Sequence, residues 1–478
     1  MYTYQDYLRI GEGEGERMKF IHSCISAHKS TELYKTAVVA DEYNKHRNVT
    51  INMFQKLLYD VTGKAVPDNW SANFKLASRF FNRFIVQENQ YLLGNGITWR
   101  EETTADALGE DFDTKMQELG LMALIGGVAF GFYDNGHLEC FSISEFVPLY
   151  DEEDGALKAG IRFWQVEDIK PLRATFYEVD GFTDYIWNRK QYENGSYKTV
   201  DEVLHEKRPY KLKIRTTEVD GTEIYDGENY PSFPIVPLWG NPSKQSELVG
   251  IREQIDCYDL IKSGYANNVD EGSLIYWTLE NAGGMDEVDL AQFIERLKTL
   301  KAATTNPGVN AQSHTVETPY QSREALLATL RADLYEDAMA LDTKNIANGA
   351  TTATQIKAAY EPLNSKTDQY EYCVREFIKG ILSIAEIDDE PVFTRSVIVN
   401  NQEEIQEIIQ SAQFLGDEYV TRKILTLLGD GDMADKIISE MDSDELGRYS
   451  EDKTEGEDLY NQGKESGREG TEGGQNEG

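Results

Sequence analysis

The sequence predicts an α+β protein: a mainly helical chain with one antiparallel β-rich insertion and a small α/β module between two long helices. Apolar residues recur every three or four positions before residue 126 and after residue 246, which is the spacing of helices with one buried face. Between residues 128 and 239, Asn-Gly and Asp-Gly pairs separate short aromatic and β-branched runs, as in an antiparallel sheet. The 478 residues suffice for two or three domains with cores of their own.

The N-terminal part of the chain contains two predicted helices before the β-rich insertion. Pro67 and Asp68 form a start signal, so we expect a helix over about 70–93, ended by the Gly-Asn-Gly at 94–96. A second helix is expected over about 104–124, ahead of a strand at 128–133. The longest apolar run, 121–132, is shorter than the roughly eighteen residues of a membrane span. We therefore expect no membrane-spanning segment.

The β-rich insertion covers about 128–239. Its turn pairs include Asn135-Gly136, Asp180-Gly181 and Asn194-Gly195, which supply the positive φ angles that tight hairpins need. The pairs recur at intervals suited to a sandwich or a small barrel. We therefore expect antiparallel strands throughout this region.

Two long helices with a mixed module between them are predicted next. The first begins near Ser246, and its apolar residues step by three or four: Leu248, Ile251, Ile255, Tyr258, Ile261, Tyr265 and Val269. The module at 272–320 has strand candidates at 274–279 and 315–318 and a helix candidate at 289–301. Ser322 is the expected cap of the second helix. Its apolar face includes Leu327, Leu330, Leu334 and Leu341.

The most regular segment is a long helix predicted over 353–385. Its apolar positions alternate four and three residues apart, which favours packing against other long helices, including those of a neighbouring subunit. Pro362 is expected to kink it. Shorter helices are expected at 402–415 and 419–428. The acidic, glycine-rich residues 442–478 are expected to be disordered.

The net charge excludes a conventional nucleic-acid-binding protein. The chain has 47 Lys and Arg against 84 Asp and Glu, a formal charge of −37. Nucleic-acid-binding proteins gain most of their affinity by neutralising phosphates with basic side chains and releasing counterions. A chain of this charge repels DNA and anionic lipid at long range.

The motifs predict no enzyme, no metal site and no cofactor. The four cysteines form no CxxC pair and the six histidines no HxxxH pair. The phosphate-binding pattern GxxxxGK[ST] is absent, and no histidine lies where it would activate a serine or a cysteine. Widely spaced cysteines of this kind are typical of reduced core residues in a cytosolic protein.

One series of motifs keeps a defined order along the chain. It runs from IVQENQYLLGNGI at 85–97 and GGVAFGFYDNGH at 126–137 to PLWGNP at 237–242. It continues with IDCYD at 255–259, then Ser263 and Asn267-Asn268, and ends with GATTATQIKAAYEPL at 349–363. Over about 30–430 this order resembles the portal proteins of tailed bacteriophages, in particular the SPP1-type family. Its most specific piece is the IDxYD…S…N run.

The resemblance implies a homo-oligomeric ring of about twelve subunits around a DNA channel at one capsid vertex. The terminase motor would package DNA through the channel, and the genome would later be ejected through it. The implied partners are the terminase large subunit, the major capsid and scaffolding proteins, the head–tail connector (adaptor) protein, and double-stranded DNA that passes without tight binding. The resemblance implies no membrane partner. The protein would be found in the virion, and in the host cytoplasm during assembly.

The resemblance also divides the chain into regions. A wing would cover 1–245, with stem helices at 246–270 and 322–341 and a clip at 271–321. A tunnel loop would cover 342–352, a long wing helix and return strand 353–399, a crown 400–441, and the tail 442–478.

Two groups of candidate site residues follow. Lys344 and Lys357 flank an interruption at 348–351; they are either ordinary surface charges or sparse phosphate contacts at a constriction of the channel. The tunnel-loop group is Lys344, Asn345, Asn348, Gly349 and Lys357. The acidic channel-lining candidates are Glu253, Asp256, Asp259, Asp270 and Glu271.

Two other functions stay open on the sequence alone. One is a phage structural hydrolase whose β-rich region presents a carboxylate pair to a polysaccharide. The other is a head–tail structural protein without a channel. An aromatic-lined cleft in a monomer would favour the hydrolase, and a ring with a central hole would favour the portal.

Overall fold

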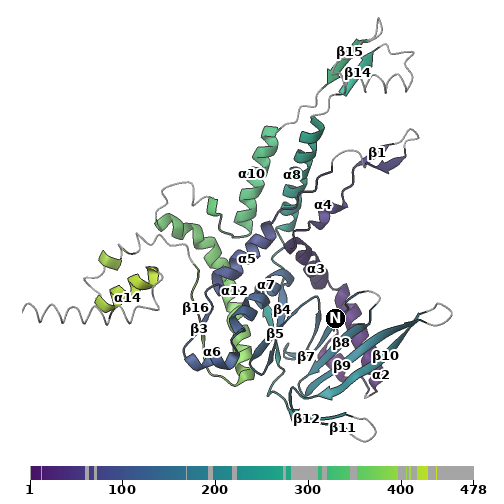
Figure 1. The fold of residues 1–478 in the computed structure, drawn as a ribbon, viewed down its shortest axis with the longest axis vertical. Coiled ribbons are helices and arrows are strands. Elements are labelled where there is room, and N and C mark those ends of the chain that lie inside the picture. Colours follow the sequence, from purple (N-terminus) through teal and green to yellow (C-terminus); the bar gives the residue numbers. More distant parts are fainter. Residues whose placement is uncertain are drawn as a thin grey trace, which may run out of the picture. The chain divides into compact units, whose positions relative to one another are not determined.

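The computed structural model describes residues 2–11, 13–59, 64–68, 73–167, 170–191, 197–217, 223–272, 276–280, 310–314, 320–344, 353–396, 405, 408–410, 417–428 and 438 (Figure 1). The chain divides into two compact units. The first comprises Met1–Asp342 and Tyr360–Ser396, and the second comprises Thr343–Ala359 and Val397–Gly478. The mixture of helices and sheets confirms the predicted α+β fold class.

The N-terminal segment is helical up to residue 53 and then changes character. Its helices are α1 (Tyr4–Leu8), α2 (Glu14–Ser30), α3 (Glu32–Asn44) and α4 (Val49–Met53). The short strands β1 (Leu57–Tyr59) and β2 (Ala65–Pro67) pair with each other. Residues 73–79 have no regular secondary structure, and α5 begins only at residue 80 (Phe80–Leu93). The predicted helix start near residue 70 is therefore wrong.

The second predicted helix is divided in two. Following β3 (Ile97–Trp99), α6 (Glu102–Leu108) ends at Gly109, and α7 (Phe112–Gly126) begins three residues later. Gly109 has a φ of +100°, a region that favours glycine, so the chain turns there instead of continuing as one helix over 104–124.

The antiparallel prediction for 128–239 is confirmed, since every strand pair in the described part of this region is antiparallel. A three-stranded sheet has the order β13-β4-β5, and a five-stranded sheet has the order β10-β9-β8-β7-β6, open at both edges. The barrel alternative is therefore wrong. The strands are β4 (Val128–Asp134), β5 (His137–Ser142), β6 (Phe146–Tyr150), β7 (Leu157–Trp164), β8 (Leu172–Glu178), β9 (Gly181–Gln191), β10 (Tyr197–Arg208), β13 (Ile235–Trp239) and the hairpin β11 (Lys211–Thr217) and β12 (Glu223–Glu228).

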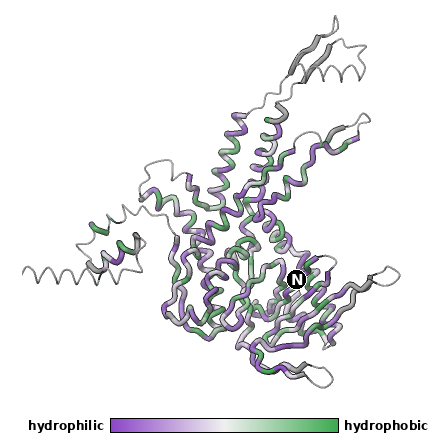
Figure 2. The backbone as a smooth tube through the Cα atoms, in the orientation of Figure 1, coloured by the Kyte–Doolittle hydropathy of each residue, from purple (hydrophilic) through white to green (hydrophobic). Residues whose placement is uncertain are grey.

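The C-terminal helices agree closely with the apolar periodicity. Helix α12 (Ala353–Ala385) has the predicted bounds and contains Pro362, and β16 (Pro391–Phe393) returns to pair with β3. Helix α8 (Arg252–Gly272) begins six residues after Ser246. Helix α10 (Tyr320–Asp337) begins before Ser322, so this serine lies in its first turn and is not its cap. In Figure 2, apolar and polar stretches alternate along α8 and α10.

The module between α8 and α10 contains a two-stranded sheet of β14 (Tyr276–Glu280) and β15 (Asn310–His314). The first strand agrees with the predicted 274–279. The predicted strand at 315–318 and the predicted helix at 289–301 lie outside the described residues. The same is true of most of the predicted crown, 400–441, including most of the predicted helix at 402–415, and of the whole acidic tail, 442–478. Helix α14 (Asp417–Leu428) lies where the second short helix is predicted.

The first unit contains two hydrophobic cores. In the larger one, α7 packs against α3, α5, β4 and β5, and α12 adds Tyr370, Phe377 and Ile381. In the smaller one, α1 and α2 cover the five-stranded sheet, where Ile21 and Cys24 pack with Phe176. Among the described helices, none is both long and apolar enough to cross a membrane.

Candidate functional site

Helices α8 and α10 lie side by side and antiparallel (Figure 1). Gln254 in the first turn of α8 donates to Asp337 in the last turn of α10. Asn268 near the end of α8, with its amide oxygen turned toward α10, accepts from Arg323 at 2.6 and 2.8 Å. The pair therefore begins and ends in register. These are the two helices that the sequence resemblance assigns to a stem.

The opposite side of α8 holds a segment that we call the arm, residues 49–79, of which 49–59, 64–68 and 73–79 are described. Three backbone amides of the arm donate to side chains of α8 at regular intervals. The amide nitrogen of Ser78 donates to Asp259 Oδ1 at 2.9 Å. The amide of Leu76 donates to Ser263 Oγ at 2.9 Å. The amide of Phe74 donates to Asn267 Oδ1 at 2.7 Å.

The spacing of these contacts has a geometric reason. Alternate amides of an extended chain point the same way and are about 6.6 Å apart, since the rise is about 3.3 Å per residue. Acceptors four residues apart on a helix are about 6.0 Å apart along its axis, at about 1.5 Å per residue. The two repeats match, so Asp259, Ser263 and Asn267 satisfy three amides that have no strand partner. This function explains the D…S…N spacing on which the sequence resemblance depends.

Side chains extend the same contact toward the start of α8. Asn48 Nδ2 donates to Asp259 Oδ2 at 2.9 Å, and Thr50 Oγ1 donates to Asp256 Oδ2 at 2.7 Å. Tyr43 also donates to Asp256. Burial raises the pKa of Asp259, although its hydrogen bonds to Asn48 and Ser78 oppose the shift.

The acidic candidates therefore differ in how far their side chains are exposed. Asp259 has no exposed surface, so the prediction that it lines a channel is wrong: its carboxylate is used inside the subunit. Asp256 is mostly buried, with 17% of its side chain exposed, and it also holds the arm. Glu253 is exposed on α8. The side chains of Asp270 and Glu271 lie outside the described residues.

The tunnel-loop candidates lie in the second unit. Lys344 and Lys357 are both exposed. Asn345, Asn348 and Gly349 lie outside the described residues. The channel role of the group stays a prediction.

A buried cluster of charges that the sequence reasoning missed lies where α5, α12 and the segment before α8 meet. Lys366 Nζ is 2.8 Å from Glu88 Oε2 and 2.7 Å from Glu247 Oε2, and it donates to Ala338 O at 3.3 Å, just beyond α10. These residues border a cavity of about 210 Å³. The signal was present in the sequence: Glu88 and Lys366 are charged residues within two helices that were predicted from their apolar periodicity.

The charges of this cluster shift the pKa values of its members. Burial raises the pKa of Glu88, and this effect is larger than the lowering caused by the positive charge of Lys366. Burial lowers the pKa of Lys366, but the charges of Glu88 and Glu247 together raise it by more. Because both carboxylates share one ammonium group, the pair is not arranged as the separate acid and base of a glycoside hydrolase. Within the described residues, no three His, Cys, Asp or Glu side chains are grouped as metal ligands.

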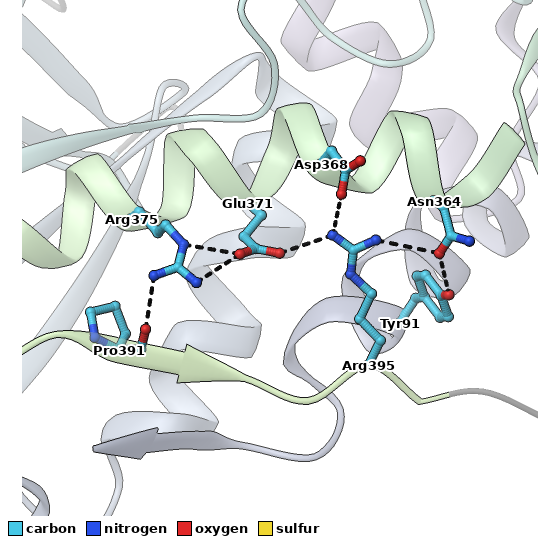
Figure 3. A network of polar contacts seen from close by, with 7 residues as sticks. All are labelled: Tyr91, Asn364, Asp368, Glu371, Arg375, Pro391 and Arg395. Carbon is cyan, nitrogen blue, oxygen red and sulfur yellow. Dashed lines mark hydrogen bonds and ion pairs between the residues drawn. The ribbon is translucent and has the colours of Figure 1, made fainter. Parts of the chain in front are cut away.

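A second polar network fixes the return strand to α12 (Figure 3). Arg395, beyond β16, forms ion pairs with Asp368 and with Glu371, the latter at 2.9 Å. Arg375 donates to Glu371 at 2.9 Å and to Pro391 O at 2.8 Å. Glu371 thus joins two arginines, one on the helix and one beyond the strand.

The sequence of the chain is similar to those of phage portal proteins. A family described as "Phage portal protein, SPP1 Gp6-like" matches residues 23–444. A portal protein of Clostridium phage phiCD119 is 24% identical over 379 residues, covering 73% of this chain and 79% of the relative. The portal protein of Bacillus phage SPP1 is 21% identical over 383 residues, covering 74% of this chain and 73% of the relative.

Solved structures show a more distant likeness. The neck of an empty gene transfer agent particle, computed with C6 symmetry, matches with a TM-score of 0.44 and 10% identity, over 73% of this chain and 90% of that one. The neck of the native particle, computed with C12 symmetry, gives a TM-score of 0.42 and 10% identity, over 72% and 89%.

Proposed function

The chain belongs to the SPP1 Gp6-like family of phage portal proteins, and from this membership we propose that it forms a ring-shaped channel at one capsid vertex. DNA would be packaged through the channel and later ejected through it. The family match over residues 23–444 carries the proposal. The antiparallel pair α8–α10, which extends over about five turns, supports it as the stem.

The proposed channel works by weak interaction with DNA. Carboxylates that surround the duplex repel its phosphates from all sides, whereas contacts that release counterions would hold it at each step. Glu253 is the described acidic candidate that is exposed on α8, and Asp270 and Glu271 follow on the same helix. Lys344 and Lys357 would supply sparse, transient phosphate contacts at the tunnel loop.

The remaining regions are assigned within this proposal. The module 271–321 is the clip that meets the terminase large subunit, and 400–441 is the crown. Residues 1–245 and 353–399 form the wing. The head–tail connector, the major capsid protein and the scaffolding protein are the other proposed partners. The proposed location is the virion, after assembly in the host cytoplasm, and no catalytic role is proposed.

Electron microscopy of the purified full-length protein tests the proposal directly. Negative-stain images should show rings with a central hole, and the mass measured by light scattering should be a multiple of the 54.3 kDa chain. Compact monomers that cleave a phage-receptor polysaccharide would contradict the portal and favour the hydrolase. Solid oligomers without a hole would favour a head–tail structural protein.

The role of Lys344 needs a separate experiment. DNA packaging and retention are measured in particles that carry Lys344→Ala or Lys344→Glu, with Lys19→Glu on the exposed face of α2 as a matched control. We expect a defect that is larger for Lys344→Glu, because it reverses the charge, and no defect for the control. Packaging at the wild-type level in both Lys344 variants would exclude the proposed contact.

A further inference from the structure

The arm and α10 lie on opposite sides of α8. At 100° per residue, the three α8 residues that hold the backbone of the arm span about 80° of the helix circumference. Gln254 and Asn268, which contact α10, lie roughly 140–180° from the centre of that arc. The order across this part of the subunit is therefore arm, α8, α10. The arm and α10 form its two outer edges.

The arm exposes apolar side chains along this edge. Met53 is 74% exposed, Phe54 54%, Leu57 52% and Phe74 51%. Large apolar side chains clustered on one exposed segment indicate a surface that another protein covers. The hydrogen bonds to α8 hold the arm in place, so the exposed side chains are presented by a segment with a defined backbone path.

The two edges also differ in charge. The arm carries four basic and two acidic residues within a chain whose net charge is −37. Helix α10 carries four acidic and two basic residues, and the two basic side chains are engaged by Asn268 and Asp342. Glu324, Asp333 and Glu336 are exposed. One edge is therefore basic and apolar, and the other is acidic.

The outer surface of α10 can be approached closely. Leu334 is buried on the side toward the subunit, whereas Ala325, Ala328 and Ala332 lie on the other side and are exposed. Alanines leave the helix backbone near the surface, so the bulky arm residues of another subunit would meet no long side chain along this line.

We propose that the arm of one copy packs against the outer edge of α10 in the next copy. This inference rests on the proposed ring and identifies which surfaces build it. A contact between two different patches is heterologous, and it closes into a ring when the rotation per subunit divides a full turn. The apolar arm residues supply the buried area. The opposite charges select the partner edge over a second arm, because like charges in contact are unfavourable.

Complementation between two defective subunits tests this arrangement. One variant carries Phe54→Glu and Leu57→Glu on the arm. The other carries Ala328→Arg and Ala332→Arg on α10. Val166→Glu changes an 80% exposed apolar residue in the loop between β7 and β8 and is the matched control. Oligomeric state is measured by size-exclusion chromatography with light scattering, and folding is measured by circular dichroism.

We expect each variant to be folded and monomeric, and the control to form rings as the wild type does. A 1:1 mixture should form heterodimers, because each pair retains one intact arm and one intact α10 edge, and no further subunit can add. Rings from either variant alone, or a mixture of folded variants that stays monomeric, would overturn the inference while leaving the ring intact. A wild type that forms no ring would overturn the proposed function itself.

Cross-linking of the wild-type ring gives a test that needs no substitution. A zero-length carbodiimide reagent should join Lys64 or Lys75 of the arm to Glu324, Asp333 or Glu336 of α10, as identified by mass spectrometry. Within one subunit these groups lie on opposite sides of α8, so such links connect two copies. A ring that yields other lysine–carboxylate links but none between the arm and α10 would overturn the inference.

Discussion

Replacing Lys366 with methionine tests how strongly the buried charge cluster stabilises the first unit. The substitution keeps an unbranched side chain that is one atom shorter, but it leaves two carboxylates without the ammonium group that lies 2.8 and 2.7 Å away. Removing one partner of a buried ion pair typically costs about 3–5 kcal/mol, because the remaining charge is buried without compensation. Glu88 is 2% exposed and is almost fully removed from water, whereas Glu247 is 16% exposed and is partly solvated.

The loss should be less than the cost of two separate pairs. Glu88 has a raised pKa, so it can take up a proton when Lys366 is absent and avoid part of the penalty. We therefore expect Lys366→Met to lower the free energy of unfolding by about 3–5 kcal/mol. Urea unfolding at a fixed protein concentration measures it. Adding Glu88→Gln and Glu247→Gln should recover part of the loss, since no buried charge then remains.

A small effect would refute this reasoning. If Lys366→Met costs less than about 1 kcal/mol, the cluster is solvated and behaves as a surface ion pair. Lys115→Met, which removes a partly exposed partner of Glu118, is the matched control and should cost at most about 1 kcal/mol.

Three further predictions concern single residues. Burial raises the pKa of Glu88 from 4.5 to about 7, so between these pH values the folded protein holds a proton that the unfolded chain has lost. The free energy of unfolding should therefore fall as the pH rises from 4.5 to about 7. Urea unfolding of Glu88→Gln should show a flatter pH profile. Asp259→Ala should cost about 2–5 kcal/mol and speed hydrogen exchange at the Ser78 amide, because the Ser78 amide and the Asn48 side chain both lose their acceptor; unchanged exchange at Ser78 would count against the arm contact. Gly127→Ala should cost about 1–3 kcal/mol in thermal unfolding, since φ is +84° and the new Cβ would lie 2.8 Å from the Gln245 carbonyl carbon, whereas Gly15→Ala should cost nothing.

Periodicity predicted the helices that bury one face along their whole length. Helix α12 has its predicted bounds because the apolar spacing continues from Ile356 to Ile384 without interruption. The last part of the arm, from about residue 70, was predicted as helix because Phe74, Phe81 and Phe84 follow a helical spacing. In the structure, Phe74 is exposed and its amide is bonded to Asn267, so a contact almost two hundred residues away decides the local conformation.

The candidate site was predicted in part for a related reason. The IDxYD…S…N run was recognised as a specific motif, but its carboxylates were assigned to a channel lining. A sequence pattern does not distinguish an exposed carboxylate from one that accepts backbone amides of a remote segment. Glu253 and Asp259 differ in this respect, although both are acidic residues of the same helix.

The sequence by itself determined the family, the mainly helical α+β class, and the long helices, because all three depend on residue order and on the spacing of apolar side chains. The tertiary structure alone decided where the charges act. It buries Asp259 against the arm, joins Glu88, Glu247 and Lys366, and places the arm and α10 on opposite sides of α8. These relations depend on distances between residues far apart in the chain, and such distances exist only after the chain has folded.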